Sequence, residues 1–580
     1  MKKTIYTTIA AAAALFAGAP AAHSQNLDPT VEVSRAYVAK KLDVNKTLIN
    51  MEVPDTVMKF DLDFDYTVND NPYKGSYEFT PYVLDMKPES HGTGSGMFFL
   101  RAGAGYGLHP TVDFVFTPNT AGSPFTMSIY GNHRSYFGNY RDIGLTADGN
   151  GAQKFDKVPK SRYFGYQSAT LAGLDGRADW NTGFFSFDVA YLGHADRDDV
   201  RKRGYDAVKA QFRAASQNSS ARYFFYDAAV GYQFGEDKIS PLAGGKSYVT
   251  GHDFSMKVTL GPVFSPSSKA LMDICADVSE YGSSVSLLAG RFSLVPKYVF
   301  SKNRWNFDIG VNFSCLFGRD WNDTGLRRAD GGQFFYPAAG VGFDAIPGYM
   351  NIFLRADGGE KVNRYSDLIA YNRHFSPLYT GSDPALLGGT VERVNAVLGF
   401  KGNISSKLIY ELKGGYADYN GYVCDAVGYD AASGTMSPGI GYGKFSWFYA
   451  ALDLQWHSQD VDAGLKASYH GRDLIRPDES AALFAPSPFT AASYVIYNWK
   501  KRIFAGLHCN AATARKADIY TIGEVRMPGY ADLGVSAEYR FSRKLSFWLY
   551  GGNLLDMTIQ RTPLYAESGI SLTAGVTLNL

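Results

Sequence analysis

Residues 571–580, SLTAGVTLNL, alternate apolar and polar or small side chains without a break. Successive side chains of a β-strand point to opposite faces, so this stretch has one apolar and one polar face. The apolar face is formed by Leu572, Ala574, Val576, Leu578 and Leu580. The wall of a transmembrane β-barrel requires this arrangement, with lipid on one side and water on the other. Taken alone, the stretch also fits an amphipathic strand of a soluble β-sandwich.

The composition of the whole chain favours the barrel. The 580 residues carry 57 basic and 56 acidic side chains, so the chain lacks the basic footprint of a nucleic-acid-binding protein. Its 40 Tyr and 39 Phe are typical of the aromatic girdles at the two interfaces of a membrane. The four cysteines lie far apart and form no CxxC pair, so the sequence predicts no metal site, disulfide framework or cofactor.

Two segments are expected ahead of the barrel. Residues 1–24 have the features of a secretory signal peptide, with a basic start, an apolar run and a small-x-small cleavage site. The chain contains no apolar run of the roughly 20 residues that a membrane helix needs. Residues 25–95 are punctuated by prolines and predict a short periplasmic or lumen-facing extension.

From residue 96 to residue 580, strands and turns alternate. Counting back from a last strand that runs to the periplasm gives 22 strands, an even number as bacterial barrels have, and the pattern predicts about 20–22. Short turns are predicted at 217–220, 265–268, 301–303, 346–347, 403–405, 458–459 and 500–501. Longer connections are predicted at 136–160, 195–204, 235–250, 318–331, 358–389, 420–441, 472–486, 514–527 and 553–566. Because long loops lie outside and short turns lie in the periplasm, the pattern predicts an all-β, antiparallel transmembrane barrel over residues 96–580.

The last strand resembles the C-terminal assembly signal of bacterial outer-membrane barrels. Thr573, Gly575, Leu578 and Leu580 occupy the polar, glycine and apolar positions of that signal, although a terminal aromatic is commoner than Leu580. The resemblance implies that the outer-membrane assembly machinery recognises this strand. It also implies an outer-membrane location, with the barrel in contact with lipid.

The end of the chain also resembles a TonB-dependent receptor barrel. Asn553-Leu554-Leu555-Asp556, Tyr565, Gly569 and Gly575 stand in the order found in that family. Members carry a folded plug domain before the barrel, whereas residues 25–95 are too few for a standard plug. Within this extension Thr30, Val31, Glu32 and Val33 resemble a TonB box, which would imply coupling to TonB.

Three functions remain open for such a barrel. The first is transport of a solute across the outer membrane, or service as the membrane component of a multi-protein complex, with residues 26–95 contacting a periplasmic or surface partner. The second is a passive diffusion porin, and the third is a structural or assembly partner without transport. Ser468 and His470 share a lumen face near Arg472 and Asp473, the residue types of a hydrolytic triad. We interpret His470 as a solvated lumen histidine and expect no enzymatic activity.

Overall fold

The computed structural model describes residues 97–580 except 107–108, 119–123, 148–150, 217–222, 242–246, 284–286, 321–333, 376–388, 405–406, 431–432, 477–481 and 520–521. The predicted signal peptide, the N-terminal extension and the TonB-box-like residues Thr30, Val31, Glu32 and Val33 lie outside the described residues. Among the described residues, no helix is long and apolar enough to cross a membrane.

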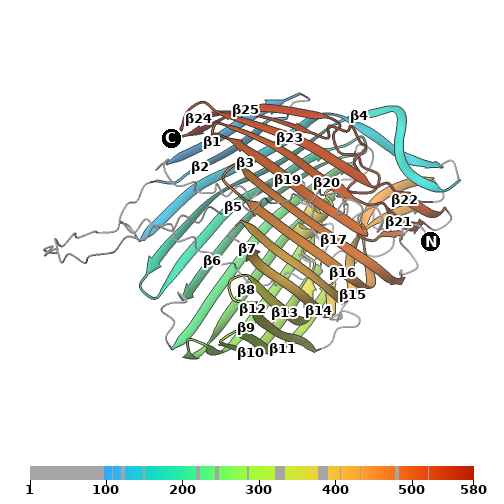
Figure 1. Ribbon diagram of the computed structural model, residues 1–580. Coiled ribbons are helices and arrows are strands. Elements are labelled where there is room, and N and C mark those ends of the chain that lie inside the picture. The colour runs from blue at the N-terminus through green and yellow to red at the C-terminus, as the bar shows by residue number, and fades with distance from the viewer. Residues whose placement is uncertain are drawn as a thin grey trace, which may run out of the picture. The chain divides into compact units, whose positions relative to one another are not determined.

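The described chain folds into a closed antiparallel β-barrel of 22 strands (Figure 1). In chain order the barrel strands are β1 (Phe98–Gly105), β2 (Thr111–Phe116), β3 (Phe125–Ala147), β4 (Gln153–Trp180), β5 (Gly183–Arg197), β6 (Arg201–Ser216), β7 (Phe224–Pro241), β8 (Ser247–Ser265), β9 (Ser268–Ser283), β10 (Leu287–Lys302), β11 (Trp305–Asp320), β12 (Phe335–Ile346), β13 (Met350–Val362), β14 (Gly389–Ile404), β15 (Leu408–Asp430), β16 (Thr435–His457), β17 (Val461–Arg476), β19 (Phe489–Trp499), β20 (Ile503–Ala512), β23 (Tyr530–Arg540), β24 (Leu545–Gly552) and β25 (Ser571–Asn579). Three short strands lie outside this ring: β18 (Ala482–Phe484) pairs with β15, and β21 (Arg515–Ile519) pairs with β22 (Gly523–Met527). The predicted strand number and fold class are therefore confirmed.

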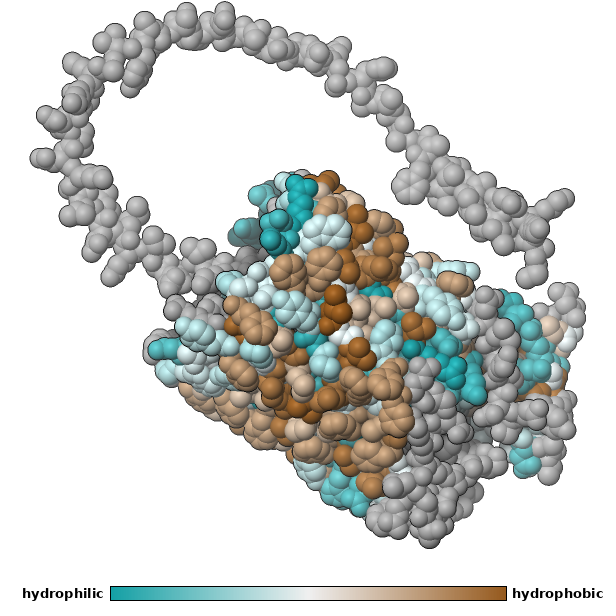
Figure 2. Space-filling view, turned by 90° about the horizontal axis from the view of Figure 1, so that it is seen from below, coloured by the Kyte–Doolittle hydropathy of each residue, from teal (hydrophilic) through white to brown (hydrophobic). Residues whose placement is uncertain are grey.

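The outer face of the barrel is apolar, as the alternation predicted. On β25, Leu572 and Val576 are 50% and 36% exposed, whereas the intervening Thr573 is buried at 6%. On β11 the same rule leaves Ile309 and Val311 exposed. Figure 2 shows apolar residues gathered over a broad area of the wall, with hydrophilic residues at its margins. This face suits lipid, and the barrel belongs in the outer membrane.

The last strand closes the barrel against the first. β25 pairs with β1 over a register that runs from Phe99↔Asn579 to Gly105↔Thr573, and the two strands lie side by side in Figure 1. Leu580 and Phe98 exchange two backbone hydrogen bonds of 2.8 and 2.9 Å. Gly575 lies under the Trp548 indole and against the Ala102 carbonyl oxygen, where any Cβ atom would clash. Of the four residues of the predicted assembly signal, Gly575 thus has a packing role as well, while the signalling role stays a prediction.

The predicted short turns at 265–268, 301–303, 346–347, 458–459 and 500–501 are present, whereas 217–220 and part of 403–405 lie outside the described residues. Several predicted loops are wrong, and the predicted connections 195–204 and 235–250 are mostly strand. Residues 136–160 and 420–441 are not open loops, because β3 continues to Ala147 and β4 begins at Gln153, and β15 continues to Asp430 and β16 begins at Thr435. A barrel strand needs only about 9–11 residues to cross the bilayer, whereas β15 and β16 have 23 residues each. The excess continues above the membrane as paired hairpins. It is held there by inward aromatic packing, such as Tyr422 against Trp447 at 5.0 Å between ring centroids.

Candidate functional site

A segment of the β13–β14 connection folds into the lumen at the extracellular side of the barrel. We call residues 363–375 the inward loop; they contain the short helix α2 (Tyr365–Tyr371). The buried side chains Tyr365, Leu368, Ile369 and Phe375 pack in one cluster with wall residues from two regions of the barrel. These wall residues are Tyr205 and Ala207 of β6, Val249 of β8, Tyr281 of β9, Val423 of β15 and Ile440 of β16. Because β6–β9 and β15–β16 stand on nearly opposite sides of a 22-strand ring, the inward loop crosses the lumen.

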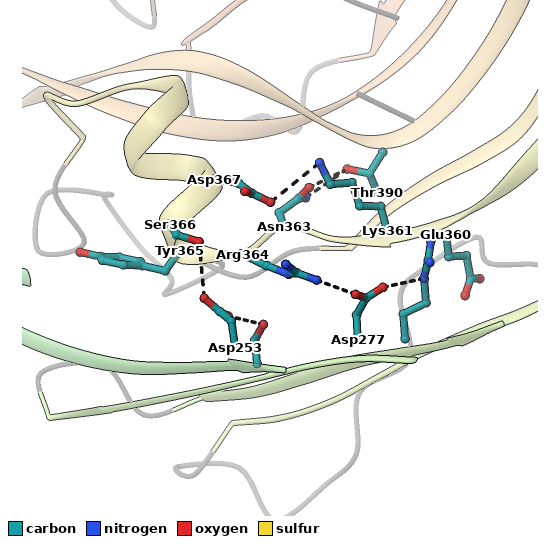
Figure 3. Close-up of polar contacts among 12 residues, drawn as sticks. Asp253, Asp277, Glu360, Lys361, Asn363, Arg364, Tyr365, Ser366, Asp367 and Thr390 are labelled. Carbon is teal, nitrogen blue, oxygen red and sulfur yellow. Dashed lines mark hydrogen bonds and ion pairs between the residues drawn. The ribbon is translucent and has the colours of Figure 1, made fainter. Parts of the chain in front are cut away.

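Polar contacts tie the start of the inward loop to β8 and β9 (Figure 3). The Arg364 guanidinium lies 2.5 Å from a carboxylate oxygen of Asp277. The backbone N–H of Tyr365 donates to the Tyr281 hydroxyl at 2.9 Å, and the Ser366 hydroxyl donates to Asp253 at 3.4 Å. Each wall partner is itself in the lumen, so these bonds are sheltered from bulk water and are worth more than surface contacts.

Arg203 of β6 is a charged anchor of the inward loop and is only 1% exposed. Its Nε and Nη2 donate to the two carboxylate oxygens of Asp237 at 2.9 and 2.6 Å. Its Nη1 donates to the carbonyl oxygens of Arg373 and Phe375, both at 2.7 Å. One guanidinium therefore satisfies a wall carboxylate and two backbone carbonyls of the inward loop, in the fork geometry that arginine provides.

The other end of the inward loop is tied to β15 and to a second inward segment. The Asn372 side-chain amide donates to Asp425 at 3.1 Å, and Asp425 also accepts from Arg515 at 2.6 Å. The His374 ring stacks on Tyr565, with 3.6 Å between centroids. Tyr565 belongs to residues 553–570, the β24–β25 connection, so two extracellular connections meet inside the mouth of the barrel.

A chamber of about 180 Å³ lies between these segments and the wall. Its lining combines apolar side chains with polar ones, which include Asp367, Asp425, Ser468, His470, Arg515 and Tyr530. The buried Nδ1 atom of His470 has no hydrogen-bond partner. Sites for drug-sized ligands have volumes of about 300–1,000 Å³. The chamber is therefore either the site of a small polar solute or a larger site that is contracted while the inward loop crosses the lumen.

No protein-family model and no curated protein matches the chain, but solved structures share its fold. The copper transporter OprC aligns over 84% of this chain and 80% of its own, with TM-score 0.56 and 12% identity. The FrpB iron transporter from Neisseria meningitidis (F5-1 variant) aligns over 83% and 82%, with TM-score 0.59 and 10% identity. The ferric-catecholate import receptor Fiu from E. coli K12 aligns over 84% and 82%, with TM-score 0.56 and 9% identity.

The chain has the fold of a TonB-dependent receptor barrel. The resemblance seen at residues 553–575 is thereby confirmed at the level of the fold. The neighbours are transporters and import receptors rather than enzymes, and the barrel resembles them in strand number and closure.

Among the described side chains, Ser468 and His470 do not form the hydrogen bond that a hydrolytic triad requires. The Ser468 hydroxyl pairs with the Thr490 hydroxyl at 2.7 Å rather than with His470. The His470 ring instead packs against Trp447, with 5.3 Å between centroids. The side chains of Arg472 and Asp473 lie outside the described part of the chain. His470 is buried rather than solvated, since only 8% of it is exposed, so that part of our interpretation is wrong.

Sequence reasoning missed the inward loop, which it treated as part of one long connection, 358–389. One local signal was available, because Tyr365, Leu368 and Ile369 follow the i, i+3, i+4 spacing of an amphipathic helix. The helix is only seven residues long, which is too short for that spacing to stand out. Its anchors, such as Arg203 and Asp237, lie on distant strands and carry no local signal.

Proposed function

We propose that this barrel takes up a polar solute across the outer membrane, and that the inward loop is its extracellular gate. The observation that supports the proposal is the path of residues 363–375, which cross the lumen between two distant parts of the wall. A passive porin needs an open mouth, whereas here Arg203, Asp253 and Asp277 hold a segment across it. Solute binding in the chamber beside Asp425 and Arg515 would compete with these ties and favour release of the inward loop.

The experiment replaces residues 364–375 with a glycine–serine segment of equal length and measures conductance in planar bilayers. We expect the parent to conduct weakly and the variant to conduct several-fold more. The matched control replaces residues 431–434, the tip of the β15–β16 hairpin, and should leave conductance at the parent value. A parent that already conducts strongly, or a variant that conducts no more than the parent, would favour the porin or a closure elsewhere in the chain.

We further propose that residues 25–95 serve as a periplasmic extension, which either closes the pore on the periplasmic side or binds a partner. Thr30, Val31, Glu32 and Val33 are the residues we propose for contact with TonB. Deletion of residues 26–90 behind the native leader tests both ideas. A rise in conductance and antibiotic sensitivity supports closure of the pore. Loss of solute uptake or of a co-purifying protein without that rise supports partner binding, and no change in any readout contradicts both.

A second candidate is the membrane component of a multi-protein complex. The long hairpins β3–β4 and β15–β16 favour it, because they offer a rigid extracellular surface beyond what the bilayer requires. In that case, solute uptake would be absent while a surface partner co-purifies with the detergent-extracted protein. A structural role without transport would show neither a rise in conductance on replacing the inward loop nor solute-dependent release of that loop.

A further inference from the structure

Three buried ligating side chains meet where the inward loop touches the wall. Asp196 is the last residue but one of β5, Asp198 lies in the β5–β6 connection, and His374 belongs to the inward loop. One carboxylate oxygen from each aspartate and one ring nitrogen of the histidine lie within 4.8 Å of one another. Their exposed fractions are 6%, 3% and 7%. We call these three residues the carboxylate–imidazole cluster.

One buried ligating atom of each residue in the cluster has no hydrogen-bond partner, and that of Asp198 has only a long ion pair with Arg201. Oδ2 of Asp196, Oδ2 of Asp198 and Nδ1 of His374 are buried and have no hydrogen-bond partner. Buried polar atoms are nearly always paired, because leaving one unpaired costs about 1–3 kcal/mol. Three such atoms on converging side chains indicate that a ligand is missing from this place, and two carboxylates with one imidazole are a ligand set for a divalent cation.

We propose that Asp196, Asp198 and His374 bind one divalent transition-metal ion, which joins the inward loop to the barrel wall. Two carboxylates balance the charge of the ion, and the imidazole selects a first-row metal over Mg²⁺ or Ca²⁺. Zinc bonds of about 2.0–2.2 Å place tetrahedral ligand atoms roughly 3.4 Å apart, so small side-chain movements would complete the site. Three protein ligands leave a position for water.

The surroundings of the cluster support each ligand. Two backbone N–H groups, of Val200 and Arg201, donate to Oδ1 of Asp198 at 2.8 and 2.7 Å and fix that carboxylate while Oδ2 remains available. Tyr565 stacks on His374 and its hydroxyl also reaches Asp198, which holds the two ligands in position.

Nearby arginines compete with such an ion for the carboxylates of the cluster. Arg203 is already committed to Asp237 and to the carbonyls of the inward loop, and Arg373 donates to Gln167 at 2.8 Å. Arg201 lies closest, with its Nε 3.4 Å from Oδ2 of Asp198, but this Nε makes no hydrogen bond. An entering ion thus displaces a long ion pair.

The test uses the full-length protein purified in detergent, stripped with EDTA, incubated with Zn²⁺ and freed of excess metal. Elemental analysis should find one zinc per chain in the parent. In His374→Ala and Asp196→Asn, the zinc retained should correspond to at least about a tenfold loss of affinity. Two matched controls should keep one zinc per chain: His508→Ala removes a lumen histidine of β20, and Asp113→Asn removes a buried carboxylate of β2. Heat-modifiable migration on gels confirms that each variant is folded.

A second measurement, on the parent alone, tests whether the ion joins the inward loop to the barrel wall. Zinc should slow hydrogen exchange at the amides of Leu368 and Asn372, which bond within the inward loop, whereas Mg²⁺ at the same concentration should not. A parent that retains no zinc, or a His374→Ala variant that retains as much as the parent, would overturn the site. Zinc binding without any slowing of exchange would overturn its role in joining the inward loop to the wall.

Discussion

Replacing Arg203 with alanine should release the inward loop without unfolding the barrel. The change removes four hydrogen bonds, two to Asp237 and two to the carbonyl oxygens of Arg373 and Phe375. It also leaves the Asp237 carboxylate buried, with the Tyr365 hydroxyl at 2.6 Å as a remaining donor. The barrel wall keeps its backbone ladder between β6 and β7, so the loss falls on the inward loop.

The expected magnitude follows from the burial of the pair. Removing one partner of a buried ion pair costs about 3–5 kcal/mol, because the other charge is left uncompensated. Each 1.4 kcal/mol is a factor of ten in an equilibrium constant, so opening of the inward loop should become about a hundredfold to a few thousandfold more favourable. The double variant Arg203→Ala/Asp237→Asn removes the uncompensated charge and should recover part of this loss.

Hydrogen exchange of residues 363–375 measures this opening. The amides of Leu368 and Asn372 donate to carbonyls within the inward loop at 3.0 and 2.9 Å, so their exchange reports loop opening. The control is Arg213→Ala, which breaks an ion pair with Asp227 that is half exposed. Exposed pairs contribute about 0–1 kcal/mol, so the control should leave exchange in the inward loop unchanged. If Arg203→Ala exchanges no faster than the parent, Arg203 does not hold the loop closed.

Three further outcomes are expected. Changing both Leu578 and Leu580 to aspartate puts two charges on the lipid face of β25 and should abolish outer-membrane insertion; normal surface levels on immunoblots would contradict the predicted assembly signal. Gly575→Val places side-chain atoms against Trp548 and the Ala102 carbonyl, and should lower the amount of heat-modifiable barrel, whereas Gly204→Val, where a Cβ atom meets open space, should lower it far less. Epitope tags at 148–150 and 431–432 should be labelled on intact cells, and tags at 347–349 should not; the reverse pattern would mean that the orientation is inverted.

The barrel could be predicted from the sequence because contact with lipid requires apolar and polar side chains to alternate, and this alternation is visible within a single strand. The period of two in residues 571–580 is visible in ten residues, and β25 occupies 571–579 of them. The same rule located the short turns, since a strand that reaches the periplasm must reverse there. The strand implied between the predicted connection 195–204 and the predicted turn 217–220 is present as β6, from Arg201 to Ser216.

The lumen side could not be predicted in the same way. A polar side chain that faces inward satisfies the alternation whatever it contacts. The sequence around Arg203 therefore could not predict its hydrogen bond to the carbonyl oxygen of Arg373, 170 residues away. Asp196 and His374 likewise meet only because the inward loop returns to β5. Above the membrane the rule itself fails, because buried residues such as Tyr422 and Val423 face protein instead of lipid. The hairpins therefore looked like loops.

The pairing of β1 with β25 has a consequence for the order of events during assembly. Other neighbours in the ring follow one another along the chain, so their contacts are local and can form one hairpin at a time. The pairing of Phe99 with Asn579 instead joins the two ends of the whole barrel. Until it forms, both strands are open edges whose backbone groups lipid cannot satisfy. Closure is thus the slow, non-local last step, and a defect at this seam should appear as loss of the protein from the membrane rather than as a partly open pore.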